Sequence, residues 1–273
     1  RSITHNERTN TMIISWWSAG VTSAVATKLA IDKYGKDNVV PIYFAIDSAH
    51  DDNARFKEQC EEWYGREIVT ERAPEKYKDQ FDVIVKDKYV NGPAGARCTL
   101  ILKKRVRQRL EKELDYEGQV FGFEYSKKEI NRAIRFKEQY PDAKPLFPLI
   151  DSKMNKPESL HYLERHAKIR RPKMYDLGYS NNNCIGCVKG GKGYWNKIRQ
   201  DFPVQFDKMA KAERLVGNSC IRNVFLDELD PEAGRQSKMI MPDCGNFCDI
   251  EFSDVLHPRL EDVYKEPEQL QLI

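Results

Sequence analysis

The chain has 273 residues, 40% hydrophobic and 32% charged, which suits a compact α/β domain with a smaller part appended to it. Lysine and arginine total 45 against 42 aspartates and glutamates, and the resulting net charge of +3 is far below that of an obligate nucleic-acid coat protein. No stretch reaches the about 18 apolar residues that a membrane-spanning helix needs, so we expect no membrane partner.

The first eleven residues, RSITHNERTNT, are polar and lack the apolar core of a secretory signal. We expect residues 1–11 to be a tail or a cloning scar, with the folded part starting at Met12. The seven cysteines are an odd number and include two closely spaced pairs. This usage favours a reducing cytoplasm, and metal or redox chemistry rather than a disulfide framework.

Strand and helix patterns alternate along the first 150 residues. Strands are predicted over 12–17, 39–47, 66–72 and 119–125, and helices over 23–35, 51–65, 99–114 and 127–140. Such alternation is typical of a parallel sheet wrapped by helices. We therefore predict a doubly wound, Rossmann-like α/β domain over residues 12–150.

Beyond residue 150 the strand patterns become rare. Helices are predicted over 156–169 and 193–217, and the glycine- and asparagine-rich loop GYSNNNCIGCVKGGKG (178–193) lies between them. We predict that residues 151–273 form a smaller, mostly helical region that carries most of the cysteines.

The segment MIISWWSAGVTSAVATKLA (12–30) runs from a buried strand through a turn of small residues into a helix. In a doubly wound sheet such a turn lies where helix N-termini meet ligands, and its backbone amides and hydroxyls can surround a phosphate. The residues expected to do so are Ser15, Ser18, Ala19, Gly20, Thr22 and Ser23. An ordinary strand-to-helix turn with a serine cap is the alternative.

Cys184-Ile-Gly-Cys187 and Cys244-Gly-Asn-Phe-Cys248 form the most specific chemical pattern in the sequence. Two close pairs can place four thiolates at the corners of a tetrahedron, around zinc or an iron–sulfur cluster. The alternative is a set of buried free cysteines. Cys98 and Cys220 are further thiols, available as replacement ligands or for catalysis.

Lys189 and Lys192 flank a glycine-rich stretch directly after the first cysteine pair. Two cations on flexible backbone could neutralise an anionic substrate or a leaving pyrophosphate. A solvated surface loop is the competing interpretation.

The segment SAGVTSAV (18–25) resembles the Ser-Gly-Gly-x-Asp-Ser loop of the PP-loop ATP pyrophosphatases, especially the phosphoadenosine phosphosulfate reductase branch with its phage-encoded members. AIDSAHDDNARF (45–56) is similar to the family's segment after the second strand, with Asp47, Ser48 and Asn53 in matching places. GARCTLILKKR (95–105) resembles its Cys-x-x-x-Lys stretch, with matches at Arg97, at Cys98 and at Lys103 or Lys104. Ala19 and Thr22 stand where the loop has a glycine and the aspartate, so a hydroxyl replaces a carboxylate.

The resemblance implies an adenine nucleotide alpha hydrolase-like fold and an ATP-dependent adenylating enzyme that is sulfurtransferase- or ligase-like. ATP with Mg²⁺ would lie over the turn, with Asp47 near the metal or the ribose, Arg97 as a further nucleotide contact, and Lys189 and Lys192 neutralising phosphate charge. Several members related to that family, including the DNA phosphorothioation sulfurtransferase, carry a [4Fe–4S] cluster, so the resemblance favours iron–sulfur over zinc for Cys184, Cys187, Cys244 and Cys248. Nucleic acid, a free nucleotide and a small metabolite all remain open as the acceptor, as does a homodimer.

A rival interpretation uses the same cysteines. Asp243-Cys244-Gly245 is similar to the Glu-Cys-Gly-x-His tail of the sulfonucleotide reductases, in which case Cys244 would be a nucleophile toward the sulfur of the substrate. A second alternative is a non-catalytic, zinc-containing protein that binds nucleotides or nucleic acid.

Overall fold

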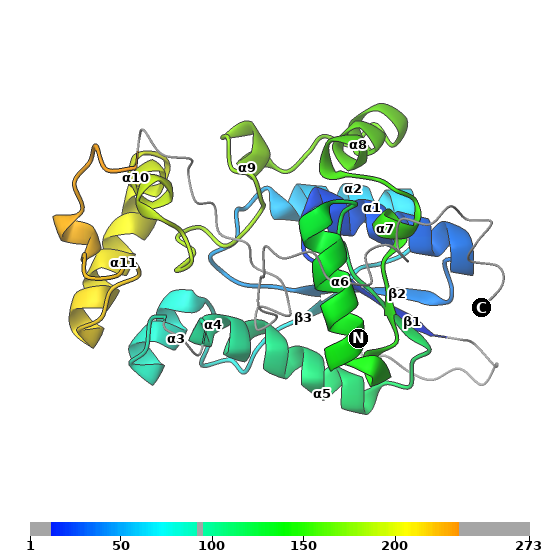
Figure 1. Cartoon of the computed structure of the whole chain (residues 1–273), viewed down its shortest axis with the longest axis horizontal. Helices are drawn as coiled ribbons and strands as arrows, with labels where there is room; N and C mark the ends of the chain where they lie inside the picture. The colour runs from blue at the N-terminus through cyan, green and yellow to red at the C-terminus, as the bar shows by residue number, and fades with distance from the viewer. Residues whose placement is uncertain (1–11, 92–94, 235–273) are drawn as a thin grey trace.

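The structure, a computed structural model, describes residues 12–91 and 95–234. Within these residues a five-stranded sheet has the order β3-β2-β1-β4-β5, and every strand pairing is parallel (Figure 1). The strands are β1 (Ile13–Trp17), β2 (Val39–Phe44), β3 (Val69–Glu71), β4 (Gly118–Val120) and β5 (Pro145–Leu146). The predicted parallel α/β fold is confirmed.

Helices connect the strands and extend beyond the last one. They are α1 (Val21–Tyr34), α2 (Asn53–Tyr64), α3 (Gln80–Asp87), α4 (Arg97–Thr99), α5 (Arg105–Glu113), α6 (Lys127–Gln139), α7 (Pro148–Asp151), α8 (Lys156–His161), α9 (Lys173–Asp176), α10 (Lys192–Asp201) and α11 (Pro203–Val216). The π-helical turns η1 (Leu100–Lys104) and η3 (Tyr162–His166) join α4 to α5 and extend α8, and the 3-10 turns are η2 (Pro141–Ala143) and η4 (Leu226–Glu228).

The two faces of the sheet carry separate apolar layers, because successive side chains of a strand point to opposite faces. Ile13 and Trp17 of β1 pack with α1 and α2 on one face. Ile14 and Trp16 pack with α5 and α6 on the other face. The sheet is therefore covered by helices on both sides, as a doubly wound fold requires.

A third apolar layer lies away from the sheet, where α11 packs against both α3 and α10 (Figure 1). It contains the fully buried Trp195, which anchors α10. Helix α3 precedes the sheet's last two strands. This smaller helical part therefore contains residues from before and from after position 150. Leu163 and Ile169, which follow that position, pack instead with the core of the sheet.

Several elements differ from the sequence-based expectations. The predicted strand over 119–125 ends at Val120 in the structure, and Gly122 beyond that end packs against the start of α1. The predicted helix over 193–217 is broken into α10 and α11 at Pro203, whose ring cannot continue a helix. Helices α3, α7 and α9 and strand β5 were not predicted.

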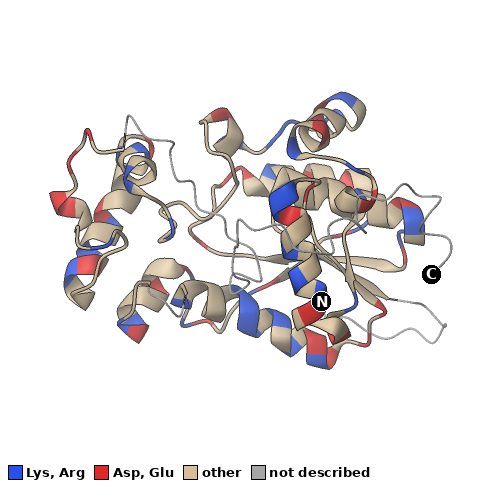
Figure 2. Cartoon of the chain, in the orientation of Figure 1, with Lys and Arg blue, Asp and Glu red and all other residues tan. Residues whose placement is uncertain are grey.

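Basic and acidic residues are interspersed along α5 and α6 (Figure 2). On α5, Arg109 lies 2.6 Å from Glu71 and Arg107 lies 3.4 Å from Glu111. Arg107 and Arg109 of the basic stretch over 103–109 are therefore each paired with a carboxylate. Within the described residues, no helix is long and apolar enough to cross a membrane.

Candidate functional site

A cavity of about 290 Å³ opens at the carboxyl ends of β1, β2 and β4. The chain leaves β1 toward β2 on one side and continues from β4 to β5 on the other, so the cavity lies where the strand order reverses. Doubly wound folds bind their ligands at this switch point. The cavity wall comes from the β1–α1 turn, the end of β2, the loop after β4, the start of α6 and the segment from α9 to Cys184.

The β1–α1 turn is braced by its own hydroxyl groups. Ser23 Oγ donates to the carbonyl of Gly20 (2.9 Å) and accepts from the backbone N–H and the hydroxyl of Ser18 (3.1 and 3.0 Å). Ala19 holds φ at +58°, a left-handed conformation that an L-residue adopts only at a cost. Such strained backbone persists where surrounding contacts hold it in place, and it is common at ligand-binding sites.

The predicted phosphate-binding residues divide into two groups. Ser18, Gly20, Thr22 and Ser23 line the cavity. Ser15 and Ala19 are buried beside it, and the hydroxyl of Ser15 shares a 2.8 Å hydrogen bond with the Thr27 hydroxyl inside the layer between β1 and α1. Ser15 therefore fixes the helix to the strand.

Helix α1 begins at the cavity without a side-chain cap, because its N-cap residue is Gly20. A helix start carries N–H groups without helical acceptors and a partial positive charge. One of them, Val21 N–H, donates to the hydroxyl of Tyr175 at 3.4 Å. Burial raises the pKa of Tyr175 to about 12, so this hydroxyl keeps its proton at neutral pH. Tyr175 thus accepts from the helix start and retains a proton for a further acceptor.

Cationic side chains outnumber acidic ones in the cavity wall. The cationic residues that line the cavity are Lys103, Lys128, Arg132 and Lys156, and the acidic ones are Glu124 and Glu129. Arg132 is held by Glu129 (3.4 Å) and lies 4.4 Å from the centre of the Phe123 ring. The surplus of positive charge, added to the helix start, favours an anionic ligand.

Aromatic rings form another part of the wall. Trp16, Trp17, Tyr43, Phe44, Phe121 and Phe123 all line the cavity. Trp17 meets the ring of Tyr43 edge-on at 5.3 Å and stacks on Phe56 at 5.7 Å, so these rings are fixed by their neighbours. An apolar, rigid wall beside a cationic one suits a ligand with an aromatic part and an anionic part.

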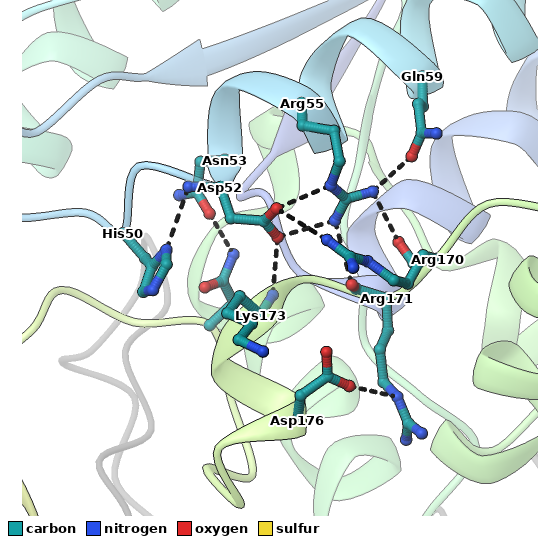
Figure 3. A network of polar contacts seen from close by, with 10 residues as sticks. His50, Asp52, Asn53, Arg55, Gln59, Arg170, Arg171, Lys173 and Asp176 are labelled. Carbon is teal, nitrogen blue, oxygen red and sulfur yellow. Dashed lines mark hydrogen bonds and ion pairs between the residues drawn. The ribbon is translucent and has the colours of Figure 1, made fainter. Parts of the chain in front are cut away.

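The segment 170–184, which supplies the far wall, is anchored to the N-terminus of α2 (Figure 3). The Asp52 carboxylate accepts two hydrogen bonds from the Arg55 guanidinium in a bidentate pair (both 2.7 Å), and a third from the backbone N–H of Lys173 (2.8 Å). Arg55 also donates to the carbonyls of Arg170 and Arg171, each at 3.1 Å. The bond from Arg55 is the main cause that lowers the pKa of Asp52.

The structure does not bring Asp47, Arg97, Lys189 or Lys192 to the cavity wall. Asp47 is exposed and lies 2.6 Å from Arg72, while its N–H bonds to the carbonyl of Lys78. Arg97 lies 2.7 Å from Asp87 and lowers the pKa of that carboxyl. Lys192 is exposed at the first turn of α10.

The two described members of the cysteine pattern lie in one tight turn. Cys184 lines the cavity, and Cys187 is buried at 6% exposure in the layer between α3 and α10. Tyr194 joins them, since its hydroxyl accepts from Cys187 N–H (2.9 Å) and donates to the Cys184 carbonyl (3.4 Å). Gly186 between them has φ +77°.

The other predicted ligands, Cys244 and Cys248, lie outside the described residues. Within residues 12–91 and 95–234, no group of three or more histidine, cysteine, aspartate or glutamate side chains could hold a metal ion. The predicted centre therefore depends on the second pair and stays a prediction. Cys60 is fully buried in the sheet core, and burial raises its pKa to about 12.

No protein-family model matches the chain, and no curated protein does.

Proposed function

We propose that the protein is an ATP-dependent adenylating enzyme of the PP-loop type, related in mechanism to sulfurtransferases and ligases. One observation carries the proposal: the uncapped start of α1 opens into a cavity at the switch point of the sheet. Helix starts at this place bind phosphate groups. The motif similarity of residues 18–25 supports the same assignment.

In this proposal the phosphates of ATP lie against the turn at Gly20 and Thr22. Lys103, Lys128 and Lys156 neutralise the phosphate oxygens, and the hydroxyl of Tyr175 donates to one of them. The aromatic wall takes the adenine. Lys103 corresponds to a lysine of the motif similarity, whereas Lys189 and Lys192 lie outside the cavity wall and have no part in the proposed site.

The proposed reaction is attack of an acceptor nucleophile on the α-phosphorus, with pyrophosphate as the leaving group. Charge builds on the phosphate oxygens during such a transfer, and fixed positive groups stabilise it. The start of α1 and the lysines of the wall supply such groups in this chain. The acceptor stays open among nucleic acid, a free nucleotide and a small metabolite.

A four-cysteine centre near the nucleotide is part of the same proposal. Cys184 reaches the cavity wall and would supply one thiolate, with Cys187, Cys244 and Cys248 as the others. Elemental analysis of protein purified without oxygen should find iron or zinc bound to the chain. Cys184→Ser should lower the amount of bound iron or zinc. Cys60→Ser, at a cysteine buried in the sheet core, should leave it unchanged.

The test of nucleotide binding is Gly20→Leu. A Cβ at this position would lie 3.5 Å from Ser18 Oγ and 3.6 Å from the Tyr175 hydroxyl, which are ordinary contacts, so the rest of the leucine must enter the cavity. Calorimetric titration should show at least about tenfold weaker ATP binding, a loss of about 1.4 kcal/mol, with little change in melting temperature. Ser152→Leu, in an exposed turn, adds similar bulk elsewhere as the control. Unchanged ATP affinity in Gly20→Leu would refute the proposed site.

A further inference from the structure

A hydrogen-bonded chain of side chains crosses the cavity wall between the β1–α1 turn and β2. Asn182 Nδ2 donates to the carbonyl of Ala19 (2.7 Å) and to Asn53 Oδ1 (2.7 Å). Asn53 Nδ2 in turn donates to the hydroxyl of Tyr43 (3.3 Å). Asn182, Asn53 and Tyr43 all line the cavity.

The donor and the acceptor of each hydrogen bond among Ala19, Asn182, Asn53 and Tyr43 can be assigned. The carbonyl of Ala19 can only accept, so the Asn182 atom beside it must be the amide nitrogen. The second proton of that nitrogen points to Asn53, which must present its oxygen. The nitrogen of Asn53 is then left for Tyr43, whose hydroxyl oxygen must accept.

Two groups at the ends of this chain have unused capacity. Asn182 Oδ1 is buried and has no hydrogen-bond partner among the described residues. The Tyr43 hydroxyl accepts from Asn53 and still has its own proton to donate, and within residues 12–91 and 95–234 no acceptor for it is found. Burial is the main cause that raises the pKa of Tyr43, so the proton stays on the oxygen at neutral pH.

A buried acceptor without a partner is destabilising, and a ligand that donates to it removes that cost. The cavity wall therefore carries one acceptor, Asn182 Oδ1, and one donor, the Tyr43 hydroxyl, at the two ends of a series joined through the Asn53 amide. The edge-on contact of Trp17 at 5.3 Å fixes the ring that carries this donor. A fixed pattern of one donor and one acceptor can discriminate between ligands of the same shape.

We propose that Asn182 and Tyr43 are specificity-determining residues that read the edge of a 6-aminopurine base. The exocyclic amino group would donate to Asn182 Oδ1, and the neighbouring ring nitrogen would accept from the Tyr43 hydroxyl. A 6-oxopurine presents the reverse order, a carbonyl oxygen beside a ring N–H. It would place an acceptor against Asn182 and a donor against a hydroxyl that already accepts. The inference depends on nucleotide binding as proposed above.

The experiment compares ATP with inosine triphosphate, which has the same shape and the opposite edge. Calorimetric titration of the full chain should give at least about tenfold weaker binding for inosine triphosphate, because sites that hydrogen-bond a substrate reject analogues that leave their groups unpaired. Tyr43→Phe removes the donor alone. It should weaken ATP binding by about three- to tenfold, the value of one hydrogen bond, and reduce the difference in affinity between ATP and inosine triphosphate. Tyr34→Phe, at the far end of α1 from the cavity, should change neither.

The outcomes separate this inference from the proposed function. If the wild type and Tyr34→Phe bind ATP and inosine triphosphate equally well, Asn182 and Tyr43 do not recognise the base. The proposal that the cavity binds a nucleotide is then unaffected. If neither binds ATP, both proposals fail. Titration with 2′-deoxy- and 3′-deoxy-ATP tests a ribose hydroxyl as the donor to Asn182. A loss of affinity there that disappears in Asn182→Ala would overturn the assignment to the base.

Discussion

Gly122→Ala gives a stringent test of how closely the loop after β4 approaches the start of α1. A Cβ at Gly122 would lie 2.7 Å from both Cα and N of Ser23 and 3.0 Å from the carbonyl carbon of Thr22. Carbon atoms in contact are ordinarily about 3.5 Å apart or more, so about 0.8 Å of movement is needed. All three atoms are backbone, and Val21 and Ala24 beside them are fully buried, so α1 has little freedom to yield.

We expect Gly122→Ala to cost about 1–3 kcal/mol, the range for overpacking a core. A loss of 2 kcal/mol corresponds to a melting temperature lower by about 4–8 °C at about 2–4 °C per kcal/mol for a chain of this size. ATP affinity should fall as well, because the shift displaces the turn that would hold the phosphates.

The control is Gly217→Ala, whose Cβ would meet nothing within 4 Å. This residue has φ +74° at the end of α11, so alanine should cost about 1 kcal/mol through backbone strain and leave ATP affinity unchanged. Differential scanning calorimetry and titration together separate the two effects. If Gly122→Ala had the melting temperature and ATP affinity of the wild type, the close approach at the switch point would be disproved.

Two further substitutions concern buried or partly buried carboxylates. The pKa of Asp52 is below its ordinary 3.8, so its contribution to stability is complete above that value and is lost as the pH falls through the lowered pKa. Asp52→Asn should therefore lower the free energy of unfolding at neutral pH by about 1–3 kcal/mol. It should also reduce the fall of that free energy at acid pH, and an unchanged fall would contradict this. Glu213 accepts from the N–H groups of Cys220 and Leu226, and burial raises its pKa above 4.5, so the fold loses stability as the pH rises from 4.5 through the raised pKa. Glu213→Gln should remove this pH dependence of the free energy of unfolding, measured by urea titration. Because an amide nitrogen then faces a backbone N–H, it should also lower that free energy by about 1–3 kcal/mol at neutral pH. A variant as stable as the wild type at pH 7 would show that these bonds contribute nothing.

The sheet could be predicted because its signals are local. A buried apolar run forms β1, and α2 begins after Asp52 and ends at Gly65, which has the left-handed φ of +61° typical of a helix terminator. Strand β5 has only two residues, too few for any periodicity. Helix α3 begins on Asp79, which accepts from Asp82 N–H, but the β-branched residues that follow this cap obscure its helical pattern.

The candidate site was only partly predictable because its far wall depends on distant contacts. The β1–α1 turn carries a recognisable pattern, and Gly20 and Thr22 do line the cavity. Tyr175 and Asn182 have no motif, since their roles come from hydrogen bonds to Val21 and Ala19, more than 150 positions earlier in the chain. Asp47 matched a motif, but its ion pair with Arg72 lies outside the cavity wall.

The anchor at Asp52 explains how these distant residues reach the turn. Asp52 and Arg55 hold the backbone of residues 170–173 against the N-terminus of α2, directly before Tyr175 (Figure 3). Asn182 attaches the same segment a second time, through Ala19 and Asn53. Asn53 follows Asp52 in sequence, so both attachments meet at the first residues of α2. The position of α2 therefore sets the far wall of the cavity relative to the β1–α1 turn, and a ligand bound between them should stabilise both attachments together.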